Sequence, residues 1–177
     1  MTTSRVHSLR RGDRRGADPV EVDESHSRLP AEYAVRMYNQ IVLPTDGSPG
    51  SQAAVDHAVH LARQNDATLH LIHVTDVSEL DDLADGPNGV AEMDDEARAV
   101  LDPVLEVAEE AGVETVMRSV EGTPHEEVIE FVETNDIDLV VMGTHGKTGL
   151  SRVLLGSTAE KIVRHSPAPV LTARAEE

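Results

Sequence analysis

The sequence contains no cysteine, so disulfide bonds, thiolate metal ligands and cysteine nucleophiles are all excluded. It also lacks any apolar run that approaches the length of a membrane span, and no apolar stretch near the N-terminus has the form of a signal-peptide core. Basic residues are scarce: 15 Lys and Arg stand against 33 Asp and Glu, and the net charge is −18. Such a charge repels nucleic acids and anionic membranes, so we expect neither as a partner. Because the sequence shows neither a membrane span nor a signal-peptide core, we expect a cytoplasmic protein.

The few positive charges are unevenly distributed along the chain. Residues 1–36 hold seven Arg and six acidic residues, whereas the remainder holds 8 basic and 27 acidic residues. Only two lysines occur, Lys147 and Lys161. So acidic a surface is typical of proteins from a salt-saturated cytoplasm, where screening over about 3 Å at molar salt removes the self-repulsion. The sequence therefore predicts a halophilic protein.

The first 36 residues are predicted to be a disordered, Arg-containing N-terminal tail, because they lack periodic apolar positions. Their Arg pairs are not followed by an apolar stretch, so a twin-arginine export signal is not supported. An alternative is that the protein starts at Met37, and nothing in the sequence decides between the two. Residues 37–177 are long enough to form one domain with its own core.

Strand and helix patterns alternate along this domain. Apolar runs predict strands at 41–45, 68–75, 114–120, 138–142 and 169–173. Helical periodicity and start signals predict helices at 49–64, 94–111, 124–135 and 157–165. Such alternation predicts an α/β fold, in which right-handed crossovers place helices on both faces of a parallel sheet. Ligands of such sheets bind beyond the carboxyl ends of the strands, where we expect segments 44–49, 74–76 and 143–157 to meet.

A glycine-rich loop, GTHGKTGLSRVLLGS at 143–157, joins the fourth predicted strand to the last predicted helix. Glycines let backbone N–H groups approach an anion, and the first helical turn adds unpaired N–H groups, so the loop suits a phosphate. Ser157 and Glu160 have capping-box spacing, which predicts the helix start. Lys147 and Arg152 add positive charge to the loop. The same glycines could instead form only a flexible connector, with Gly156 and Ser157 as a turn and an N-cap.

Other polar residues give weaker signals. Asp46 follows the first predicted strand and could contact a ligand, but an Asp before Gly-Ser more often accepts backbone N–H bonds in a turn. His70 and His73 lie three apart on a predicted strand and so face opposite sides, and no metal site is predicted. No Ser-His-acid set can be placed and the glycines lack Walker spacing, so no catalytic residue is predicted.

Residues from about Met37 to Arg174 resemble a universal stress protein domain. The resemblance is carried by IVLPTDGS at 41–48, DLVVMG at 138–143, GTHGKTGLSRVLLGST at 143–158 and SPAPVLTAR at 166–174. The spacing Gly-x-x-Gly-x9-Gly-Ser is similar to that of the ATP-binding subset of the family. The resemblance implies a three-layer, doubly wound, five-stranded parallel sheet of order 3-2-1-4-5. It also implies a homodimer formed through the last strand, where Val170 and Leu171 make the least acidic edge.

The resemblance further implies an ATP site, with Mg²⁺ held mainly by phosphate oxygens. The implied cofactor-binding residues are Pro44, Thr45 and Asp46 near adenine and ribose, Val74 at the adenine edge, and Met142, Gly143, Gly146, Lys147, Gly156, Ser157 and Thr158 along the strand end and phosphates. Three functions stay open: an ATP-binding stress or regulatory module with slow or no hydrolysis, an ATP-hydrolysing enzyme of the pyrophosphatase kind, and a nucleotide-free dimeric interaction module. Pro49 disfavours the second because it removes an N–H donor after the first strand, and the complete glycine motif disfavours the third.

Overall fold

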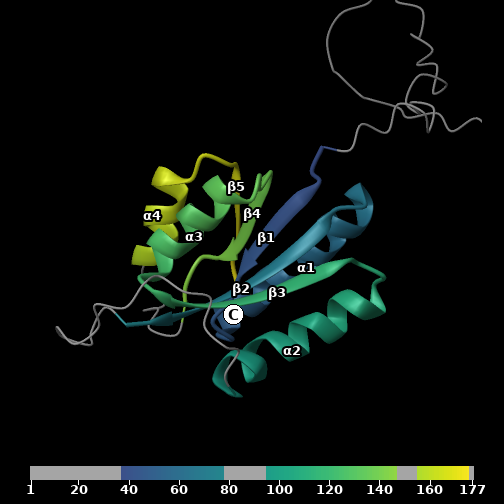
Figure 1. Cartoon of the computed structure of the whole chain (residues 1–177), viewed down its shortest axis with the longest axis horizontal. Helices are drawn as coiled ribbons and strands as arrows, with labels where there is room; N and C mark the ends of the chain where they lie inside the picture. Colours follow the sequence, from purple (N-terminus) through teal and green to yellow (C-terminus); the bar gives the residue numbers. More distant parts are fainter. Residues whose placement is uncertain (1–36, 78–94, 147–154, 176–177) are drawn as a thin grey trace, which may run out of the picture. The chain divides into compact units, whose positions relative to one another are not determined.

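A parallel sheet of five strands forms the centre of the domain (Figure 1). The computed structural model describes residues 37–77, 95–146 and 155–175, and these belong to one unit, Arg36–Glu177. The strands are β1 (Gln40–Pro44), β2 (Thr68–Asp76), β3 (Thr115–Gly122), β4 (Leu139–Gly143) and β5 (Val170–Ala173). Their order is β3-β2-β1-β4-β5 and every neighbouring pair is parallel. The predicted fold class and strand order are therefore confirmed.

In the part of the chain that the structure describes, four helices cover the two faces of the sheet, two on each (Figure 1). They are α1 (Pro49–Asn65), α2 (Asp95–Glu110), α3 (Pro124–Thr134) and α4 (Ser157–His165). Buried side chains of α1 and α2 form one apolar core with the sheet, and those of α3 and α4 form a second core on the opposite face. Within the described residues, no helix is both long and apolar enough to cross a membrane.

The two central strands are apolar along their length because helices cover both of their sides. In β1, Ile41 and Leu43 belong to the core beneath α1 and α2, while Val42 between them belongs to the core beneath α3 and α4. In β4, Val141 and Val140 divide between the two cores in the same way. Since successive strand residues point to opposite faces, a strand buried on both sides needs apolar residues at every position.

The helix starts agree with the predicted positions but not always with the predicted caps. Ser48 caps α1: its Oγ accepts the Ser51 N–H at 3.2 Å, and Pro49 is the first helical residue. Thr123 is the N-cap of α3, but its side chain makes no cap hydrogen bond. The last helix begins at Ser157, and its N-cap is Gly156 rather than Ser157. Gly156 has extended backbone angles and its carbonyl accepts the Glu160 N–H at 2.8 Å, which leaves Ser157 inside the first turn.

The strand order reverses beside β1, and this reversal creates the place for a site. From β1 the chain adds β2 and β3 on one side of the sheet, and it then crosses to the other side of β1 to add β4 and β5. The loops that follow β1 and β4 therefore leave the sheet toward opposite faces, since α1 and α4 cover different faces. A crevice at the carboxyl ends of the strands is the geometric consequence.

Candidate functional site

A cavity of about 780 Å³ opens at the carboxyl ends of β1, β2 and β4. Its wall comes from the loop after β1, the last residues of β2, the loop after β4, and the first turns of α2, α3 and α4. All the predicted cofactor-binding residues except Lys147 line it: Pro44, Thr45, Asp46, Val74, Met142, Gly143, Gly146, Gly156, Ser157 and Thr158. Lys147, like Arg152, lies outside the described residues. The fold thus brings three distant segments of the chain together around one space.

The loop after β1 is held by bonds to its own side chains and to β2. The Thr45 N–H donates to the Ile72 carbonyl at 3.0 Å, and the Gly47 N–H donates to Thr45 Oγ1 at 3.3 Å. The Ser48 N–H donates to Asp46 Oδ1 at 3.0 Å, so Asp46 makes the turn that its position before Gly-Ser indicated. These bonds fix the Asp46 carboxylate at the cavity wall.

A buried histidine on β2 forms a hydrogen bond with this loop. His73 on β2 is 3% exposed and lines the cavity, and its Nδ1–H donates to the Thr45 carbonyl at 3.0 Å. Thr45 Oγ1 in turn donates to Ser51 Oγ at 3.2 Å in the first turn of α1. Thr45 thus links β2 to the first turn of α1 through two hydrogen bonds at the cavity wall, one accepted by its carbonyl and one donated by its hydroxyl. The sequence considered His73 only as a metal ligand and gave no signal for this role.

The first glycine of the loop motif permits close packing between backbones. A Cβ atom added at Gly143 would collide with the backbone of Gly50, and it would lie 2.8 Å from the Ser51 nitrogen. An added Cβ at Gly50 would collide with the His145 carbonyl oxygen. Gly143 and Gly50 therefore let the end of β4 and the start of α1 touch. At Gly146, an added Cβ would lie 2.6 Å from Asp46 Oδ2.

The start of α4 presents backbone donors to the cavity. The Gly156 N–H is already used, because it donates to the Thr144 carbonyl at 2.8 Å. The next three N–H groups, those of Ser157, Thr158 and Ala159, belong to the first helical turn, for which a helix provides no backbone acceptor. All three residues line the cavity. A helix start of this kind favours negative charge, and here the donors begin at Ser157 rather than at Gly156.

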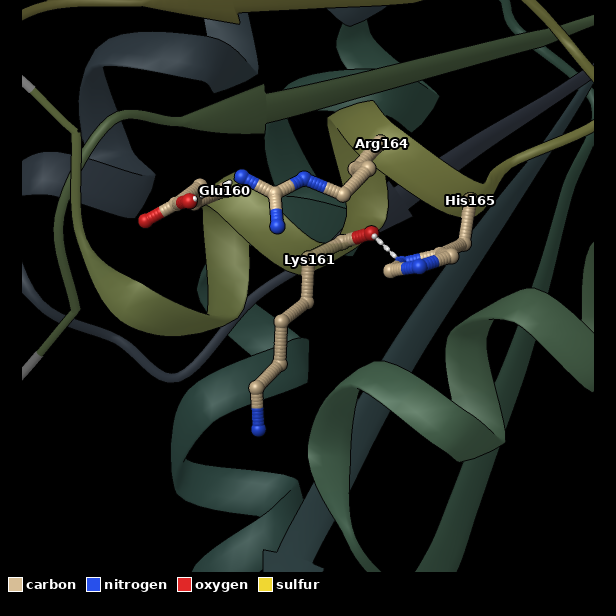
Figure 2. A network of polar contacts seen from close by, with 4 residues as sticks. All are labelled: Glu160, Lys161, Arg164 and His165. Carbon is tan, nitrogen blue, oxygen red and sulfur yellow. Dashed lines mark hydrogen bonds and ion pairs between the residues drawn. The ribbon is translucent and has the colours of Figure 1, made fainter.

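The charged side chains of the cavity wall are acidic in the part of the chain that the structure describes. Asp46, Asp76, Glu96 and Glu160 contribute carboxylates, and no described lining residue is Lys or Arg. The Glu160 carboxylate is paired with Arg164, whose Nη2 lies 2.6 Å from Oε1 (Figure 2). An anionic ligand therefore depends on backbone donors, on accompanying cations, and on pairing of these carboxylates.

Some lining residues were not predicted. Asp76 lies in the segment 74–76 that was expected at this edge, so the strand-end argument could have found it. Glu96 comes from the first turn of α2 and Pro124 from that of α3, and only the packing of these helices against the sheet brings them here. Within the described ranges, no group of three His, Asp or Glu side chains is arranged to hold a metal ion.

A family model, related sequences and solved structures all match this chain to the same protein family. The universal stress protein family matches residues 37–174. A universal stress protein of Methanocaldococcus jannaschii is 43% identical over 141 residues, which cover 78% of this chain and 83% of that protein. The solved structure of a second universal stress protein from the same organism is 28% identical with a TM-score of 0.65, and the match covers 80% of this chain and 99% of that one. A universal stress protein solved in complex with cAMP is 25% identical with a TM-score of 0.61, over 79% and 99% of the two chains.

Proposed function

Because the chain belongs to the universal stress protein family, we propose that it is an ATP-binding stress-response or regulatory module whose cavity takes an adenine nucleotide. The observation that carries this proposal is the convergence of the predicted residues, from three separated segments, on one cavity at the strand ends. Its volume of about 780 Å³ lies within the range of small-molecule sites, and strand ends beside an order reversal are where such sheets bind nucleotides. The family structure in complex with cAMP supports a nucleotide as the ligand class.

The proposed orientation follows from the donors. The phosphates lie at the start of α4, where the N–H groups of Ser157 and Thr158 and the positive end of the helix favour them. The base and ribose lie toward the ends of β1 and β2, against Pro44, Thr45 and Asp46, with Val74 at the adenine edge. Met142, Gly143 and Gly146 close the floor between these two ends, and Lys147 is proposed to contact the outer phosphates. Mg²⁺ accompanies the nucleotide, held mainly by phosphate oxygens.

The site is proposed to bind ATP with slow hydrolysis or none. Catalysis of phosphoryl transfer to water needs a group that positions the water and cations that stabilise the charge of the transition state. Of the described lining residues none is a Lys or Arg. A steady-state turnover of about 1 per second or more, within the usual enzyme range, would contradict this part of the proposal.

The test is titration calorimetry with ATP on the parent and on two variants of Gly156. Its φ of −68° suits any residue, so a substitution there acts through space rather than through backbone strain. An added Cβ lies 3.2 Å from the Thr144 carbonyl oxygen, so Gly156→Ala should fit with a small shift and retain binding. The branched side chain of Gly156→Val should displace the helix start and abolish binding while circular dichroism shows an intact fold.

Two outcomes would count against the proposal. If Gly156→Val binds ATP as tightly as the parent, the loop is only a connector and the nucleotide site is wrongly assigned. If the parent binds no adenine nucleotide, and mass spectrometry of the freshly purified protein releases none, the nucleotide-free interaction module becomes the better interpretation.

We propose also that the protein is a cytoplasmic homodimer adapted to high salt. β5 is an edge strand of the sheet, and Val170 and Leu171 on it are half-buried, so pairing with a second copy would cover the apolar surface that remains. The net charge of −18 would be screened in molar salt. Full secondary structure and ligand binding in dilute buffer as well as in molar KCl would contradict the salt adaptation.

A further inference from the structure

An ion pair on α4 joins a residue of the cavity wall, Glu160, to a residue outside it, Arg164. Arg164 Nη2 is 2.6 Å from Glu160 Oε1, and the two residues are four apart on the helix. Figure 2 shows the Arg164 guanidinium beside the Glu160 carboxylate, while Lys161 extends away from it. The side chains are 66% and 54% exposed, so water weakens the attraction between the two charges without separating them.

Glu160 is the member of the pair that matters for a ligand. It lies in the first turn of α4 and lines the cavity together with Ser157 and Thr158. A phosphate held by the first N–H groups of this helix would therefore meet a carboxylate within the same turn. By Coulomb's law in water, two like charges about 8 Å apart weaken each other's binding roughly twofold. The penalty multiplies with each further charge on the ligand.

We propose that Arg164 is a positioning residue that neutralises Glu160 and thereby lets the start of α4 accept a ligand with several phosphates. Arg164 does not line the cavity, so it acts by offsetting the charge of Glu160 rather than by contact with the ligand. The pair sets selectivity by phosphate number: it favours a nucleoside triphosphate over the monophosphate, and it leaves the uncharged nucleoside unaffected. This inference rests on the proposed nucleotide site.

A purely structural role for the pair makes a different prediction. A Glu followed by an Arg four residues later stabilises a helix by about 0.2–0.5 kcal/mol, and a Glu in the first turn also interacts favourably with the helix dipole. If that were the whole role, Arg164→Gln would lower the melting temperature slightly and would change the affinities for all nucleotides by one common factor. The ratio of affinities for different phosphate numbers therefore separates the two roles.

The experiment compares adenosine, AMP and ATP by titration calorimetry without divalent cations in about 0.1 M KCl, where charges still interact over about 10 Å. The proteins are the parent, Arg164→Gln, Glu160→Gln and the double variant. Lys161→Gln is the matched control, because it removes the same charge from the same helix. It also keeps the backbone carbonyl that accepts the His165 Nδ1–H at 2.9 Å (Figure 2). Circular dichroism in the same buffer checks that every variant is folded.

The expected result is a loss that grows with ligand charge. With screening included, Arg164→Gln should weaken ATP binding about fivefold and AMP binding about twofold, and leave adenosine unchanged. The double variant should recover the parent's ratio of ATP to AMP affinity, and Lys161→Gln should leave that ratio nearly unchanged. Raising KCl to about 1 M should remove most of the difference between Arg164→Gln and the parent.

Each contrary result has a distinct meaning. An unchanged ATP to AMP ratio in folded Arg164→Gln would overturn the inference while leaving the nucleotide site intact. A lowered ratio that Glu160→Gln does not rescue would mean that Arg164 touches the phosphates itself, which contradicts a role through Glu160. A parent that binds neither ATP nor AMP, at about 0.1 M KCl and also at about 1 M KCl where its acidic surface is screened, would overturn the proposed function, and this inference with it.

Discussion

Gly143→Ala should unfold the domain at a markedly lower temperature even when no nucleotide is present. The added methyl group would collide with the backbone of Gly50 and would lie 2.8 Å from the Ser51 nitrogen. Neither obstacle is a side chain that could rotate away, so the end of β4 and the start of α1 must separate. Among the described glycines, positive φ angles occur at Gly47, Gly112 and Gly122, so at Gly143 the cost is steric rather than conformational.

The magnitude follows from the kind of contact. Overpacking a core typically costs about 1–3 kcal/mol, and contact with rigid backbone on the blocked side favours the upper end, about 3 kcal/mol. For a domain of this size that corresponds to a decrease in melting temperature of about 10 °C. Gly156→Ala is the comparison, because its Cβ approaches the Thr144 carbonyl oxygen only to 3.2 Å and should cost about 1 kcal/mol or about 3 °C.

The assay is thermal unfolding followed by circular dichroism, with ATP absent and the salt concentration fixed. If Gly143→Ala melts no lower than Gly156→Ala, the contact with α1 does not constrain the loop and the reasoning fails. If the prediction holds, the first glycine of the motif is required for packing between elements. Loss of ATP binding in a Gly143 variant would then say nothing about contact with a phosphate.

Three further predictions concern other elements. Because Gly156 and not Ser157 caps α4, Ser157→Ala should leave the melting temperature nearly unchanged. A decrease equivalent to about 1 kcal/mol of stability would instead indicate that the Ser157 side chain caps the helix. Val170→Asp or Leu171→Asp should give monomers by light scattering in high salt. Because both side chains also pack against the cores, these variants could lose stability. Thr172→Asp changes an exposed position on the same strand and should disturb the fold less. Dimers in all three variants would place the interface elsewhere. Burial, and secondarily Arg118, lowers the pKa of His70, so its contribution to stability is present above the usual histidine pKa and is lost as the pH falls below it. The free energy of unfolding, measured with denaturant at about pH 7.5 and about pH 5.5, should therefore decrease more for the parent than for His70→Leu as the pH is lowered. Equal decreases in the two proteins would refute this.

The sequence by itself determined the order of elements and the edge of the sheet where a site can lie. Continuous apolar runs such as Ile41 to Leu43 indicated strands buried on both faces, and their alternation with amphipathic helices leaves few topologies. Pro49 and Ser48 marked the start of α1 because their chemistry suits a helix start in any context. The segments that line the cavity were found for the same reason: loops after parallel strands all emerge at one edge.

Only the tertiary structure decided which groups at that edge are free and which are engaged. The sequence shows Gly156 beside Ser157, but whether an N–H is available depends on a carbonyl twelve residues earlier, that of Thr144. It shows Gly143 as part of a glycine motif that suits phosphate binding, yet the atoms that forbid a side chain there belong to α1. His73 and Glu96 reach the cavity because β2 and α2 pack where they do. Local patterns encode local hydrogen bonds and burial periodicity, whereas contacts between distant segments depend on packing that no single segment contains.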